Sequence, residues 1–201
     1  MRKFILLVAI SVSFASSSFA QSPDFGRFNL GLDGGVPLYN MRAIFHNPGI
    51  GGSLKYEYKL NNRAYLTTHF LNHLNFLNRL YVNLSAGYEV FSVKLPLQNP
   101  YVPSTYGYVP IKVGLKYYAI AGLFVEEQFG EVIYTQHGGG DSNTNAPGIG
   151  YTFHSGFEIR VGYEYWKQYP ENHIPGDYGQ SGPFSKPDNF RQFGLRLSER
   201  F

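Results

Sequence analysis

The sequence predicts an all-β protein, a closed antiparallel up-and-down β-barrel, on three observations. Long segments alternate apolar and polar residues with the period of two that a strand with two different faces requires. Tyrosine, phenylalanine and glycine are abundant, at 17, 17 and 23 residues, while charged residues make up only 15%. The connections between the alternating segments come in two sizes, short turns and long segments rich in proline, glycine and asparagine.

Nine segments alternate, and they cover residues 26–37, 49–60, 63–74, 79–91, 107–118, 122–134, 146–153, 156–168 and 189–201. The stretch "SLKYEYKL" is typical, because Tyr56 and Tyr58 share one face while Lys55 and Glu57 share the other. A single-chain bacterial barrel has an even number of strands. The segment 64–80 alternates cleanly in neither phase, so we prefer eight strands. Ten strands are the alternative, in which 91–98 forms a strand of its own.

The first twenty residues predict a cleaved signal peptide. Arg2 and Lys3 precede an apolar run over 4–12, and Ser18 and Ala20 stand where signal peptidase reads small residues. The run is too short to cross a bilayer as a helix. We therefore expect a leader over 1–20 and one barrel domain over 21–201.

The composition bears on partners. Without the leader, Lys and Arg fall from 17 to 15 against 14 acidic residues, so the net charge is about +1 and gives no reason to propose nucleic acid as a partner. The chain has no cysteine, so no disulfide stabilises this exported protein.

The layout of the connections predicts a transmembrane barrel of the bacterial outer membrane. Short turns, such as Asn61-Asn62, fall at one end of the strands, and long loops over about 38–48, 92–106, 136–147 and 168–188 fall at the other. This is the arrangement of outer-membrane barrels, in which the apolar face meets lipid. A soluble carrier barrel requires the reverse polarity, with its apolar face inside.

The polar face is then expected to line the lumen. Its predicted charged residues nearly balance in sign, and they are Asp33, Lys55, Glu57, Lys59, Glu89, Lys112, Lys116, Glu126, Glu158, Arg160, Glu164 and Arg196. Where Glu126 and Glu127 interrupt the alternation, one carboxylate of a regular strand would face lipid, and a β-bulge is the expected remedy.

The chain ends on "FGLRLSERF", in which Phe193, Leu195 and Leu197 alternate before the final Phe201. This pattern resembles the C-terminal insertion signal of bacterial outer-membrane proteins, although Glu199 departs from it. The whole mature chain resembles the small OmpA/OmpX-type barrels, and "VPIKVGLKYY" with the turn after it resembles porin-like barrel domains. The resemblance implies outer-membrane lipid, lipopolysaccharide and the barrel-assembly machinery as partners.

An eight-stranded barrel is just wide enough for side chains to fill. We therefore expect a closed lumen, no enzymatic activity, and a structural or surface-interaction role carried by the long outer loops. A narrow porin-like channel for small polar solutes is the alternative, and a lipid-modifying outer-membrane enzyme is the second alternative.

The histidines favour neither chemistry nor a metal. His69 and His73 on one strand face would lie about 13 Å apart, too far to hold one ion. His154 falls at the short-turn end, away from surface lipid, and His137 with Asp141 has no positioned serine that the sequence identifies. No catalytic, cofactor or metal site is predicted.

Overall fold

The computed structural model describes residues 26–45, 47–60, 79–92, 104–135, 142–168 and 189–201. The predicted leader over 1–20 and the candidate strand over 63–74 lie outside these residues. In the described part of the chain, no helix is both long enough and apolar enough to cross a membrane.

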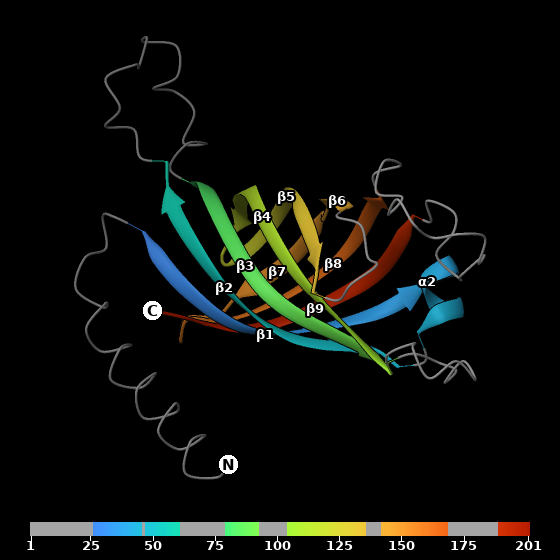
Figure 1. The fold of residues 1–201 in the computed structure, drawn as a ribbon. Coiled ribbons are helices and arrows are strands. Elements are labelled where there is room, and N and C mark those ends of the chain that lie inside the picture. The colour runs from blue at the N-terminus through green and yellow to red at the C-terminus, as the bar shows by residue number, and fades with distance from the viewer. Residues whose placement is uncertain (1–25, 46, 61–78, 93–103, 136–141, 169–188) are drawn as a thin grey trace, which may run out of the picture.

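The strands form one closed antiparallel ring (Figure 1). Their bounds are β1 Arg27–Leu38, β2 Gly49–Lys59, β3 Leu80–Ser92, β4 Thr105–Ile120, β5 Leu123–Tyr134, β6 Ser142–Asn145, β7 Gly148–Thr152, β8 Phe157–Gln168 and β9 Phe190–Arg200. Neighbours pair in chain order, and the blue β1 lies beside the red β9 in Figure 1. This last pairing closes the sheet, so no strand edge remains.

β6 and β7 are two parts of one barrel strand. Both lie between β5 and β8. Asn145 at the end of β6 pairs with Tyr165. Gly148, three residues further on, pairs with Gly162, three residues further back, so the register is unbroken. The interruption falls at Pro147, which has no N–H to donate to the ladder. The ring therefore has eight strands, which confirms the preferred count.

One end of the barrel, the turn end, has the tightest connections. Ala121 and Gly122 join β4 to β5 with φ angles of 31° and 92°. Residues 153–156 join β7 to β8 at the same end. β2 pairs directly with β3, so the connection between these strands is the long segment 60–79. The short turn expected at Asn61-Asn62 lies outside the described residues.

The opposite end, the loop end, has the connections 39–48, 93–104, 135–141 and 169–189. The first of these contains the short helix α2, Tyr39–Ile44, which lies at the mouth of the barrel in Figure 1.

The wall of the barrel has an apolar outside and a polar inside. Leu32, Leu84 and Phe193 are 70%, 55% and 56% exposed, and similar side chains follow on every barrel strand. Between them, the alternate side chains of the same strands are buried and mostly polar. An apolar belt of this kind has favourable contacts in lipid and not in water, so the ring has the polarity of a membrane barrel.

The bulge expected at Glu126 and Glu127 is absent. β5 and β4 keep one register there, with Glu126 opposite Lys116 and Glu127 opposite Leu115. The register shifts only near the β4–β5 turn, between Tyr118 and Ile120. The strand keeps its ladder hydrogen bonds through this region, which places Glu126 inside the barrel and leaves Glu127 on the outer face.

Candidate functional site

The lumen is filled at the loop end by an apolar cluster, which we call the aromatic plug. Its buried members are Met41, Phe45, Phe91, Tyr108, Val132, Trp166 and Phe190. Phe45, directly after α2, is 1% exposed, and its ring centroid lies 5.2 Å from that of Phe91 and 6.2 Å from that of Tyr108. The β1–β2 connection thus supplies side chains that pack against inward residues of distant strands.

Below the aromatic plug, six charged side chains form the central ion-pair cluster. Its members are Lys55, Glu57, Lys116, Glu126, Glu158 and Arg160, and each is at most 6% exposed. Three cations meet three carboxylates, so the charges of the cluster balance. Burial of charge is tolerated only with such pairing, because an unpaired ion in the interior loses its hydration without compensation.

The contacts of the cluster link four strands. Lys116 Nζ donates to Glu57 Oε1 at 2.8 Å and forms an ion pair with Glu158. Lys55 Nζ donates to Glu126 Oε1 at 2.7 Å. Arg160 Nε lies 2.6 Å from Glu126 Oε2. Each carboxylate of the cluster therefore has a cation in direct contact.

Aromatic and amide groups complete the surroundings of the cluster. The Lys116 ammonium lies 3.9 Å from the centroid of the Phe124 ring, within the range of a cation–π contact. Asn83 Nδ2 donates to Glu126 Oε1 at 2.9 Å, and Gln128 Nε2 donates to Asn83 Oδ1 at 2.8 Å. Neutral donors thus extend the charged cluster across the lumen.

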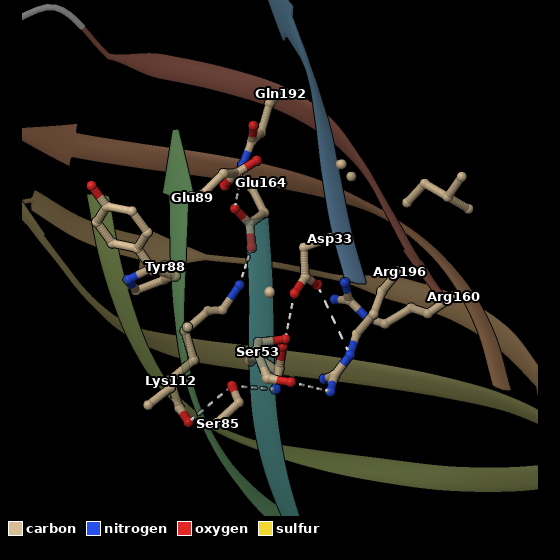
Figure 2. A pocket seen from close by; sticks show the side chains of 18 residues that line it. Asp33, Ser53, Ser85, Tyr88, Glu89, Lys112, Arg160, Glu164, Gln192 and Arg196 are labelled. Atoms are coloured by element: carbon tan, nitrogen blue, oxygen red, sulfur yellow. Dashed lines mark hydrogen bonds and ion pairs between the residues drawn. The ribbon is translucent and has the colours of Figure 1, made fainter. Parts of the chain in front are cut away.

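A second polar group lies around a small cavity, shown in Figure 2. Lys112 forms an ion pair with Glu164. Gln192 Nε2 donates to Glu164 at 2.7 Å and to Glu89 at 3.3 Å. The cavity that these side chains line has a volume of about 50 Å³. It has room for a few water molecules.

The predicted lumen residues can now be placed. Of the twelve charged residues predicted to line the lumen, ten are buried or nearly so; they are Lys55, Glu57, Glu89, Lys112, Lys116, Glu126, Glu158, Arg160, Glu164 and Arg196. The Asp33 side chain is more exposed, at 28%. Lys59 differs, because it is half-buried at the last position of β2. No ion pair in the described part of the chain includes Lys59.

The aromatic plug was missed by the sequence reasoning. Its signal is a reversal of polarity near the loop end, where apolar residues take positions on the polar phase. Tyr108 follows the phase of Lys112, and Trp166 follows the phase of Glu164. Phe91 is likewise an apolar residue on the polar phase, the phase of Glu89, whereas Val90 is on the apolar phase. Phe91 belongs to β3 and does not begin a separate strand.

The residues of the expected assembly signal lie along β9. Phe193, Leu195 and Leu197 are 56%, 45% and 38% exposed on the outer face. The backbone N–H of Phe201 donates to the carbonyl of Phe28 at 2.9 Å, which ties the end of this strand to β1. Recognition of these residues by an assembly machinery stays a prediction.

Of the six histidines, only His154 lies in the described residues, exposed in the β7–β8 turn. His69, His73 and His137 lie outside them. Within the described residues, no group of three or more histidine or acidic side chains is placed to hold a metal ion.

A closed eight-stranded ring with an apolar belt and a charged interior defines a small bacterial outer-membrane β-barrel. Solved structures share this fold. Ail, the attachment invasion locus protein of Yersinia pestis, matches with a TM-score of 0.51 and 14% identity, over 88% of this chain and 99% of that one. The outer-membrane enzyme PagL matches with a TM-score of 0.50 and 13% identity, over 85% of this chain and 98% of that one.

The N-terminal barrel domain of Pseudomonas aeruginosa OprF is also similar, with a TM-score of 0.48 and 12% identity, over 88% of this chain and 98% of that domain. No known family matches the sequence. No curated protein matches it either. The likeness is one of fold, and with the apolar belt it makes this chain an outer-membrane β-barrel.

Proposed function

We propose that this protein is a non-conducting, non-enzymatic barrel whose role is structural or depends on binding at the cell surface through its loop-end segments. The observation that carries the proposal is the filled lumen. The aromatic plug occupies the loop end, and the central ion-pair cluster occupies the level below it. A conducting pore needs a continuous wet path, and two filled levels in series support a closed lumen.

Because the lumen is filled, we assign the function to the loop-end segments. Two of them are long, over 93–104 and 169–189, and both are rich in proline. Connections held on a rigid scaffold are where binding residues concentrate. Ail, of similar fold, has been solved in complex with the heparin analogue sucrose octasulfate. That complex supports ligand binding as one use of this fold, although fold alone does not assign a function.

The partners proposed for the wall follow from its polarity. The apolar belt is suited to the acyl chains of outer-membrane lipid and lipopolysaccharide. We propose that the barrel-assembly machinery recognises the alternating pattern that ends at Phe201.

Conductance tests the closed lumen. The refolded chain is inserted into planar lipid bilayers beside a known porin, which shows that insertion and recording work. We expect discrete current steps from the porin and none from this protein. Reproducible steps that scale with the amount of this protein favour the porin-like alternative instead.

The absence of enzymatic activity has its own measurement. Mass spectrometry of lipid A from cells with and without expression of the chain should give the same spectrum. A mass change that depends on expression supports the lipid-modifying alternative. Deletion of residues from 169–189, in a variant that still folds, tests whether this loop-end segment carries the proposed binding at the cell surface.

A further inference from the structure

A polar stripe crosses the apolar belt on one side of the barrel. It consists of side chains on the outer phase of β5, β6 and β8, namely Glu127, Glu131, Asn143, Asn145 and Lys167. On β1 to β4, by contrast, exposed leucine, isoleucine, valine and tyrosine side chains dominate the outer face. The stripe is therefore a local feature of one wall.

The stripe lies within the apolar belt and not above it. Along β5, Glu127 stands between Val125 and Phe129, which are 49% and 52% exposed. Glu131 stands between Phe129 and Ile133, and Ile133 is still 37% exposed. Ionisable side chains at this level are costly against lipid, and in membrane proteins they usually have a partner.

Within the described residues, the barrel supplies no side chain in direct contact with these ionisable groups. Glu127 Oε1 is shielded and accepts no hydrogen bond from the described residues. No ion pair in the described part of the chain includes Glu131 or Lys167. Two carboxylates and one ammonium thus point outward at the level of the belt.

The register arranges acceptors and donors on opposite sides of one strand. Glu131 of β5 pairs with Asn143 of β6, and Asn143 pairs with Lys167 of β8. Glu127 precedes Glu131 by four residues in β5, and Tyr163 precedes Lys167 by four residues on the outer phase of β8. Tyr163 therefore lies level with Glu127 in the register. The acids therefore lie on the β5 side, and the ammonium and a phenol hydroxyl lie on the β8 side.

We propose that this stripe binds a second copy of the same chain. A two-fold axis along the membrane normal, running over the strand formed by β6 and β7, brings β5 of one copy against β8 of the other. Glu131 of each copy then meets Lys167 of the other, and Glu127 meets the Tyr163 hydroxyl. A two-fold interface must be complementary to itself, and a face with acceptors on one side and donors on the other meets that condition.

Cysteine cross-linking tests the position of the axis. The chain has no native cysteine, so single substitutions are unambiguous. Asn145→Cys, beside the axis, should give a disulfide-linked dimer in lipid vesicles on mild oxidation, and Asn143→Cys provides a second position. Leu54→Cys is the matched control, because Leu54 is 49% exposed on β2, at the opposite wall of the ring.

Equal linking of the stripe and control variants indicates random collision and overturns the proposal. Failure of both stripe variants to link, with folded protein verified by circular dichroism, also overturns it. In whole cells, Asn145→Cys could instead cross-link only to a different membrane protein. That result assigns the stripe to another partner and overturns the proposal of a second copy.

A charge exchange tests the contact itself. Glu131→Lys and Lys167→Glu should each weaken association about tenfold, measured by energy transfer between labelled copies in vesicles. The double variant reverses the pair and should recover association close to that of the parent. Single variants that associate as the parent does, or a double variant no better than the singles, contradict the proposed contact.

Discussion

Removal of one cation from the central ion-pair cluster should destabilise the whole barrel. Lys116→Met keeps the length of the side chain and removes its charge. Lys116 is fully buried and contacts both Glu57 and Glu158. The variant leaves three carboxylates with two cations in the interior, so one buried negative charge lacks its counterpart.

The size of the effect follows from the remaining contacts. Breaking a buried ion pair on one side typically costs about 3–5 kcal/mol. Lys55 Nζ lies 3.9 Å from Glu57 and 3.7 Å from Glu158, so it compensates part of the lost attraction. We therefore expect the lower end, a loss of about 3 kcal/mol in the free energy of unfolding.

Urea unfolding in lipid vesicles measures this change. The chain has a single tryptophan, Trp166, which is 1% exposed in the aromatic plug, so its emission reports the opening of the barrel. Lys59→Met is the control, because this half-buried lysine has no ion pair in the described residues; a loss under about 1 kcal/mol is expected. Adding Glu57→Gln to Lys116→Met restores the charge balance and should recover about 2 kcal/mol.

Two results would refute this reasoning. One is a Lys116→Met barrel that unfolds within about 1 kcal/mol of the parent. The other is a double variant no more stable than Lys116→Met alone, because charge balance would then not be the reason for the loss.

Three further predictions concern the wall, the plug and the terminus. Leu84→Arg places a charge on the lipid face of β3, where Leu84 is 55% exposed, and should cost about 2–4 kcal/mol in vesicle unfolding; an equal loss for Leu84→Ala would contradict the lipid contact. Phe45→Ala removes a ring in contact with four others of the plug region and should cost about 3–5 kcal/mol in the same assay, whereas a loss below about 1 kcal/mol would show that the plug is loosely packed. Phe201→Asp should lower the amount of barrel in the outer-membrane fraction more than Phe201→Tyr does, and equal amounts would remove the proposed role in assembly.

Strand positions were the most predictable part of the fold. The expected strand 156–168 is found as Phe157–Gln168, and the expected 189–201 is found as Phe190–Arg200. The alternation suffices here because a shift of one residue exchanges the two faces, and the two faces meet different surroundings. The same pattern placed Lys55 and Glu57 on one face before any partner was known.

The partners themselves could not be predicted. Lys55 meets Glu126, 71 positions away, because the ring brings β2 and β5 to one level of the lumen, and that depends on the register of every intervening strand. The position of Phe45 in the plug was equally hidden, since Phe45 follows a short helix whose course the pattern does not indicate. The bulge expected at Glu127 was wrong, because β5 keeps its register with β4 there and leaves Glu127 on the outer face.

The pairing of β1 with β9 has a consequence for the order of assembly. Asn29 pairs with Arg200 across 171 positions of the chain, so this contact has a much larger loop-closure entropy than any hairpin of the barrel. Arg196 Nη2 donates to the carbonyls of Asn29 and Ser53 at 3.2 and 3.3 Å, and these bonds join β9 to β1 and β2. They can form only when the two open edges meet. Arg196 therefore belongs to the late stage of folding, and its replacement should accelerate unfolding while leaving the earlier hairpins to form at their usual rate.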